Sequence, residues 1–190
     1  QLTSKGAAVS LKAGVPMQVR ISGLKPATRY NYALIDPASG RLILPVEQPG
    51  SFQTARMAGA SFSFAVQADS HLDDAGTPQI YQATLANIRA ARPDFLIDLG
   101  DNFMSEKLAV QTQTEIANRH LLYRPYFGSV CHSVPLFIAL GNHEGELGWR
   151  LTGSANSLPV MATNTRKLFY PNPFPNSFYT GDTIPENFVG

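Results

Sequence analysis

Residues 95–102 read FLIDLGDN, a short apolar segment that ends in a glycine, a carboxylate and a carboxamide. Similar segments lie on both sides of it in the chain: residues 62–71 read FSFAVQADSH and residues 136–144 read LFIALGNHE. Short, nearly continuous apolar runs are typical of strands that are buried on both faces of a parallel sheet. We therefore expect three buried strands, each followed directly by a polar cluster.

The segments between these strands have helical patterns. Thr77 suits an N-cap, Pro78 suits the first helical position, and apolar residues recur at helical spacing until Pro93 ends the pattern. A second helical pattern covers roughly residues 112–126, whereas the Pro-, Asn- and Ser-rich stretch from residue 154 onward predicts an ordered loop. The order strand, helix, strand, helix, strand indicates an α/β unit with a parallel sheet.

The first 57 residues have a different pattern. Apolar and polar residues alternate over 15–21 and 30–34, and glycines and prolines separate the runs, so we expect short antiparallel strands. Residues 24–30, LKPATRY, resemble the Leu-x-Pro-x-Thr-x-Tyr corner of fibronectin type III and similar sandwiches. A complete sandwich needs about 100 residues, so we expect residues 1–57 to form part of an all-β sandwich.

Composition excludes several classes of function. The net charge is +1 and only 15% of residues are charged, which argues against a nucleic-acid partner. The longest apolar runs are about five residues, far fewer than the ~20 that span a bilayer, so no membrane partner is expected. Cys131 is the single cysteine, which excludes an internal disulfide and a thiolate zinc cluster. The start at Gln1, without an initiator Met, suggests a processed or cut N-terminus.

The three polar clusters carry the chemistry of the sequence. Ligands bind at the carboxyl ends of the strands in an open α/β sheet, so the clusters should meet there. Their carboxylates, imidazoles and carboxamide suit Zn, Mn or Fe better than Ca. Asp-x-His or Gly-Asp alone more often caps a turn, but a buried strand that ends in Asn142, His143 and Glu144 is costly unless these groups are used. The three clusters in this order therefore favour a metal site.

With these motifs the sequence resembles the calcineurin-like metallophosphoesterase superfamily, whose signature is Asp-x-His, Gly-Asp and Gly-Asn-His-Asp/Glu, each after a strand. The match covers Ser61 to about Gly148. The resemblance implies that residues 58–190 are the N-terminal, truncated half of a four-layer αββα metallophosphoesterase domain. It also implies that residues 1–57 are part of a fibronectin type III-like domain, as found before the catalytic module of purple acid phosphatases. A phosphate-ester hydrolase in a secreted or periplasmic location follows from the same resemblance.

The resemblance assigns a role to each site residue. Asp69 and His71 would bind a first metal ion, Asp101 would bridge two ions and Asn142 would bind the second. His143 would stay off the metals and contact the phosphate or protonate the leaving oxygen. The ions, Fe, Mn or Zn, would lower the pKa of a bridging water so that hydroxide is available near neutral pH.

Two further residues are candidates for orienting this site. Glu144 would orient the neighbouring imidazole or the following loop, with a solvated or capping carboxylate as the alternative. Asn102, which follows the bridging aspartate, would orient its neighbours in the second cluster.

The sequence departs from the family in two places. Met104 occupies the position at which the purple subgroup has an iron-ligating Tyr, and the first cluster of that subgroup normally lacks a His, so a purple Fe(III) site is not expected. The family also supplies three further histidines on the C-terminal side of the third cluster, one alone and two in Gly-His-x-His. No histidine follows His143 in this sequence, and the two that remain, His120 and His132, precede the third cluster. His120 lies in the second helical pattern, where a satisfied or exposed helical histidine is expected.

Two functions therefore remain open. The first is metal-dependent hydrolysis of a phosphate ester, with the remaining histidine ligands on a C-terminal half of the domain in the same or a separate chain. The second is a non-catalytic fragment that acts in binding or assembly. A monoester, diester, nucleotide or pyrophosphate would suit the same metal pair. Half of a two-sheet fold leaves one apolar sheet face uncovered, which predicts aggregation or pairing with a complementary segment.

Overall fold

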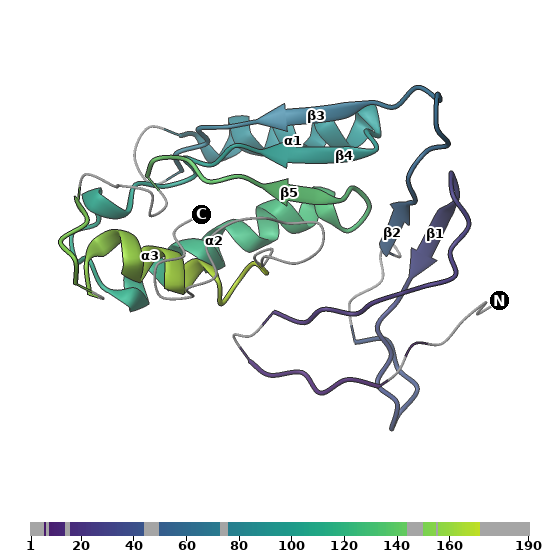
Figure 1. Cartoon of the computed structure of the whole chain (residues 1–190), viewed down its shortest axis with the longest axis horizontal. Helices are drawn as coiled ribbons and strands as arrows, with labels where there is room; N and C mark the ends of the chain where they lie inside the picture. Colours follow the sequence, from purple (N-terminus) through teal and green to yellow (C-terminus); the bar gives the residue numbers. More distant parts are fainter. Residues whose placement is uncertain are drawn as a thin grey trace.

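The computed structural model describes residues 6, 8–13, 16–43, 50–72, 76–143, 150–154 and 156–171. Its elements, shown in Figure 1, are β1 (Arg29–Tyr32), β2 (Gly50–Gln53), β3 (Phe64–Gln67), α1 (Pro78–Ala91), β4 (Phe95–Asp98), the 3-10 helix η1 (Ser105–Lys107), α2 (Gln113–Cys131), β5 (Leu136–Ile138) and α3 (Leu158–Arg166). None of the helices within these ranges is long and apolar enough to cross a membrane.

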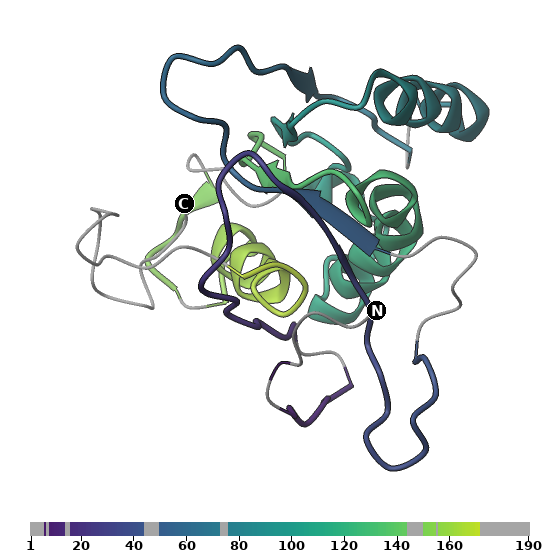
Figure 2. The ribbon, with the colours of Figure 1, turned by 90° about the vertical axis from the view of Figure 1, so that its right-hand side faces the viewer.

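The three predicted strands form one parallel sheet in the order β3, β4, β5. Val66 lies beside Ile97, which lies beside Phe137, so the strands are in register where their carboxyl ends meet. Helices α1 and α2 lie on the same side of this sheet (Figure 2). The prediction of a parallel sheet covered by helices is confirmed.

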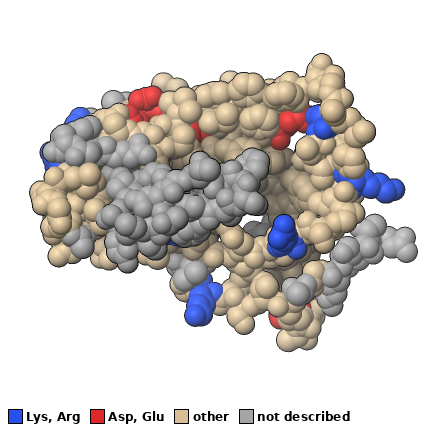
Figure 3. Space-filling model, in the orientation of Figure 1, with Lys and Arg blue, Asp and Glu red and all other residues tan. Residues whose placement is uncertain are grey.

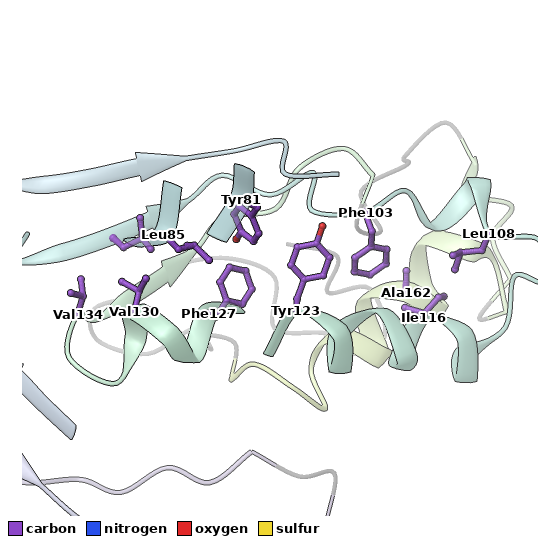
Figure 4. Close-up of a cluster of buried hydrophobic side chains, with 11 residues drawn as sticks. Tyr81, Leu85, Phe103, Leu108, Ile116, Tyr123, Phe127, Val130, Val134 and Ala162 are labelled. Carbon is purple, nitrogen blue, oxygen red and sulfur yellow. The ribbon is translucent and has the colours of Figure 1, made fainter. Parts of the chain in front are cut away.

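The core lies between the sheet and the helices. Tyr81 and Leu85 reach it from α1, and Leu96 of β4 is fully buried. Figure 4 shows Tyr123 and Phe127 of α2 packed along this layer, near Ala162 of α3. The members of the cluster are Tyr81, Leu85, Leu96, Phe103, Leu108, Ile116, Tyr123, Phe127, Val130, Val134 and Ala162.

The opposite face of the sheet is uncovered among the described residues. Phe64 and Val66 of β3 are 52% and 49% exposed, and Phe137 of β5 is 58% exposed. The ring of Phe64 stacks on that of Phe95 at a centroid distance of 5.3 Å. The surface over β3 and β4 in Figure 3 is mostly uncharged. The prediction that these strands are buried on both faces is therefore wrong for the described chain, because both covering helices pack on one side. The separate prediction that one apolar face of the sheet is uncovered holds for the described residues.

The N-terminal part forms a smaller sheet. β1 and β2 pair antiparallel, with Tyr30 opposite Phe52 and their rings 5.8 Å apart. The hydroxyl of Tyr30 accepts a hydrogen bond from the backbone N–H of Lys25 (2.9 Å), as a tyrosine corner does. Residues 16–22, by contrast, form no strand, and Val19 and Ile21 are exposed. The expected all-β sandwich is thus not formed by the described residues, because the alternating segment has no neighbouring strand to pair with.

The helices follow the predicted patterns in part. α1 begins at Pro78 and ends at Ala91, before Arg92 adopts a left-handed conformation. α2 continues to Cys131, five residues beyond the predicted end, although Pro125 lies inside it. Side chains after the proline pack into the core and stabilise these last turns. α3 lies in the stretch that was predicted to be a loop, and its proline stands at the helix start, where it is tolerated.

Candidate metal centre

The clusters that follow β3 and β4 meet at the carboxyl edge of the sheet. One ligand atom each from Asp69, His71 and Asp101 lies within 4.8 Å of the others. The backbone N–H of Asp69 donates to the carbonyl oxygen of Gly100 at 3.0 Å, which joins the two loops directly. The structure therefore brings together three of the four side chains that were predicted to bind metal.

The backbone at these three residues is strained. Asp69, His71 and Asp101 have φ angles of 56°, 38° and 53°, in the left-handed region that L-residues rarely adopt. Among the described non-glycine residues, only Ala27 and Arg92 share this feature. Such conformations cost about 1–3 kcal/mol each and concentrate at functional sites. The strained positions are therefore the same three residues whose ligand atoms converge.

The third cluster is attached to the second through a carboxylate. The backbone N–H of His143 donates to Oδ1 of Asp101 at 2.9 Å. A Cβ atom at Gly141 would lie 2.1 Å from the same oxygen, so only glycine fits beside this carboxylate. Asn142 lies between them in the chain and is exposed, in the loop that closes on the site. Asn142, the fourth predicted ligand, thus lies at the same sheet edge. It directly precedes His143, whose backbone N–H is hydrogen-bonded to Asp101.

Glu106, which the sequence did not single out, contacts the predicted acid. Nδ1 of the His143 imidazole makes a short contact with Oε1 of Glu106. The hydroxyl of Ser105 donates to the carbonyl oxygen of His143 at 2.6 Å, so η1 holds both the ring and the backbone of this histidine. Glu144, which was predicted for the orienting role, lies outside the described residues.

Asn102 links the first two clusters through its side chain and its backbone. Its amide nitrogen donates to Asp98 (2.8 Å), and its amide oxygen accepts from the hydroxyl of Ser70 (2.9 Å). The hydroxyl of Tyr123 donates to the Asn102 carbonyl oxygen and accepts from the backbone N–H of Leu72 at 2.9 Å. A single phenol from α2 therefore joins the loops on both sides of the candidate ligands. The orienting role expected of Asn102 stays a prediction.

Asp98 is a buried carboxylate beneath the site. It has no exposed surface and accepts hydrogen bonds from the side chain of Gln67 (2.6 Å) and the backbone N–H of Gly100 (3.0 Å). Burial raises the pKa of this carboxyl, although the hydrogen bonds oppose the shift. In the sequence, the feature that could have identified Asp98 is a charged residue at the C-terminal end of an apolar strand. By accepting the hydrogen bond from Gly100, the Asp98 carboxylate holds the turn that positions the second cluster.

The chemistry of the gathered residues fits a metal ion. Nδ1 of His71 is buried and has no hydrogen-bond partner among the described residues. The carboxylates of Asp69 and Asp101 repel each other at this separation unless a cation lies between them. Two carboxylates and an imidazole are ligands that Zn, Mn and Fe accept. We conclude that Asp69, His71 and Asp101 are able to hold such an ion.

His120 is not part of this group. Its side chain is buried in α2, with ring centroids 5.0 Å from Phe103 and 5.1 Å from Phe169. Burial, assisted by the charge of Arg166, lowers the pKa of His120 from 6.5 to about 3. The imidazole therefore remains neutral in the core near neutral pH.

This buried imidazole predicts a loss of stability in acid. The unfolded chain binds a proton at His120 between pH 6.5 and about 3 that the folded chain does not, so stability falls as pH falls through this window. The contribution is about 2 kcal/mol between about pH 7 and about pH 5. Urea unfolding at these two pH values should show a smaller difference for His120→Phe than for the wild type. An equal difference in the two proteins would show that this imidazole does not titrate on unfolding.

Comparisons with known proteins bear on the fold and the family of the chain. The structure of purple acid phosphatase PPD1 from yellow lupin (Lupinus luteus) seeds is similar over 82% of this chain, with a TM-score of 0.53 and 16% identity, and this chain spans 28% of that one. At this identity the likeness shows the fold alone. The comparison with curated proteins found no match. The family model of the calcineurin-like phosphoesterases matches residues 62–186, which include every polar cluster described above. The chain therefore belongs to the calcineurin-like phosphoesterase family.

Proposed function

We propose that the chain supplies the N-terminal part of a two-metal centre that hydrolyses phosphate esters. The observation that carries this proposal is the convergence of Asp69, His71 and Asp101 within 4.8 Å at the carboxyl edge of the sheet. Membership of a phosphoesterase family supports metal-dependent phosphoester hydrolysis in general. The number of ions and the role of each residue are our own assignments.

Each gathered residue has a place in this proposal. Asp69 and His71 would hold the first ion, Asp101 would be a ligand shared by both, and Asn142 would hold the second through its neutral amide oxygen. When bound, the ions would supply Lewis-acid stabilisation of a phosphoryl group and a metal-activated water. A neutral fourth ligand leaves the centre enough positive charge to attract a phosphate ester.

His143 is proposed to contact the phosphate or protonate the leaving oxygen. The contact between its Nδ1 and Glu106 sets the orientation of the ring and leaves Nε2 for the substrate. The hydrogen bond from Ser105 to the His143 carbonyl oxygen holds the backbone at the same time. Glu106 is thus proposed for an orienting role of the kind that the sequence suggested for Glu144, whose own role stays a prediction.

Further ligands are proposed to come from polypeptide that covers the open face of the sheet. Phe62, Phe64, Val66 and Phe137 expose about half or more of their surface there, which is unfavourable in water. Asp69, His71 and Asp101 supply three ligands among the described residues, whereas two ions need more. A segment of the same or a separate chain that packs on this face would also reach the carboxyl edge of the strands.

The function is tested by metal-dependent hydrolysis of p-nitrophenyl phosphate. The protein, with the polypeptide that covers the open face present in the same or a second chain, is stripped with a chelator and then loaded with Mn, Zn or Fe. We expect activity to be lost on stripping and to return with at least one of these metals. Metal binding without hydrolysis of any phosphate ester would instead favour the alternative, a fragment that acts in binding or assembly.

The spectrum of the iron-loaded protein gives a separate prediction. Met104 is buried, 5% exposed, in the segment that follows the Gly-Asp motif. A thioether cannot produce the tyrosinate-to-iron charge transfer that colours purple phosphatases. We therefore expect no intense visible band when the stripped protein is loaded with Fe(III). A strong purple absorption would mean that a tyrosine binds the iron after all.

A further inference from the structure

A cleft of about 690 Å³ lies at the amino-terminal edge of the sheet, away from the candidate metal centre. It is formed between the β1–β2 pair and the C-terminal ends of α1 and α2, at the end of the molecule that faces the viewer in Figure 2. The polar residues that line it are Arg29, Ser51, Arg89, Arg92, His132 and Ser133.

The charge in this cleft is of one sign. Three guanidinium groups line it, and none of the described lining residues is acidic. Arg29 is held in place, because its Nη2 donates to the hydroxyl of Ser51 at 2.9 Å and to the carbonyl oxygen of Ser133 at 3.5 Å. Arg89 and Arg92 are exposed, and neither forms an ion pair within the described part of the chain. Two guanidinium groups therefore remain to bind a ligand.

The helix ends do not neutralise this charge. The C-termini of α1 and α2 border the cleft, and each carries the equivalent of about −0.5 charge. Together they offset about one of the three positive charges, which leaves a net charge of about +2. Like charges along one cleft repel each other and raise its potential, and a bound anion relieves that repulsion.

The chemistry of the lining selects among anions. Guanidinium groups bind phosphate oxygens through paired N–H donors, and the serine hydroxyls and His132 add further polar contacts. The volume lies within the range of about 300–1,000 Å³ that is usual for small-molecule sites. We propose that this cleft binds a small phosphorylated anion, at a site separate from the metal centre.

Calorimetric titration of the whole chain tests this site. Metal is first removed with a chelator and dialysis, so that the metal centre does not bind the probe. Inorganic phosphate and adenosine monophosphate are titrated at low salt into the wild type and into Arg89→Gln/Arg92→Gln. The control, Arg20→Gln/Arg124→Gln, removes the same charge from exposed arginines that do not line the cleft.

The Arg89/Arg92 pair should weaken binding by about tenfold or more, and the control pair by less than about twofold. Tighter binding of the nucleotide would assign the site to an organic phosphate, and equal affinities would assign it to phosphate itself. Equal losses in the two double variants, or no binding by the wild type at millimolar phosphate, would overturn the proposal.

Chemical modification gives a second readout that needs no variant. Phenylglyoxal modifies accessible arginines, and peptide mass spectrometry reports the rate at each position. Phosphate should slow the modification of Arg89 and Arg92 and leave that of Arg124 unchanged. Equal rates with and without phosphate at all three residues would contradict the site.

Discussion

Asp101→Asn is expected to lower kcat/KM for p-nitrophenyl phosphate by on the order of a thousandfold or more at saturating metal, because metal ions supply several kcal/mol of transition-state stabilisation. Asparagine tolerates the positive φ of 53° at this position, and it retains an acceptor for the backbone N–H of His143. The substitution therefore removes the charge of the proposed bridging ligand while it preserves the fold around it.

Asp36→Asn is the matched control for this charge. Asp36 lies in an exposed turn, where its carboxylate accepts from the backbone N–H of Ala38 at 3.0 Å. Its replacement should leave hydrolysis within about twofold of the wild type, because Asp36 is not among the residues that meet at the candidate metal centre and salt screens its charge. Near wild-type hydrolysis by Asp101→Asn would remove this carboxylate from the catalytic machinery.

Tyr123→Phe is expected to lower both stability and metal affinity. The hydroxyl that it removes joins the carbonyl oxygen of Asn102 to the backbone N–H of Leu72, on either side of the candidate ligands. Losing these two hydrogen bonds should cost about 2 kcal/mol or more in the free energy of unfolding. Metal affinity should fall by about 10- to 100-fold, as it does when groups that orient ligands are removed. Urea unfolding of the stripped protein and metal titration measure the two effects separately.

Tyr126→Phe provides the comparison within the same helix. The ring of Tyr126 lies 6.3 Å from that of Tyr123, but no hydrogen bond from its hydroxyl is present among the described residues. Its loss should change stability by less than about 0.5 kcal/mol and should leave metal affinity unchanged. Equal effects of the two substitutions would mean that the network around Asn102 does not position the site.

The parallel sheet was predictable from the chain because local rules set it. Apolar runs that end in Gly-Asp or Gly-Asn specify strand ends, and Thr77, Pro78 and Pro93 mark the limits of α1. The burial of each sheet face was not predictable, because alternation in the run from Phe62 to Ala68 points the wrong way. Phe62, Phe64 and Val66 share the more apolar side, yet that side is the exposed one. Packing of distant segments decides which face is covered. The same reason accounts for the continuation of α2 beyond Pro125.

The candidate ligands were predictable because the carboxyl ends of neighbouring parallel strands must meet. Glu106, Tyr123 and Asp98 were not identified, because their contacts join residues whose spacing follows no short motif. The strand expected over residues 15–21 failed for a related reason: alternation permits a strand but does not provide its partner. Tertiary contacts therefore account for most of what the sequence did not reveal.

Anomalous diffraction from crystals soaked in zinc or manganese tests the metal centre most directly. We predict an anomalous peak within about 2.0–2.2 Å of ligand atoms of Asp69, His71 and Asp101. A second peak about 3.5–4 Å away would establish the two-metal arrangement. Strong metal sites elsewhere, with no peak among these three side chains, would contradict the account.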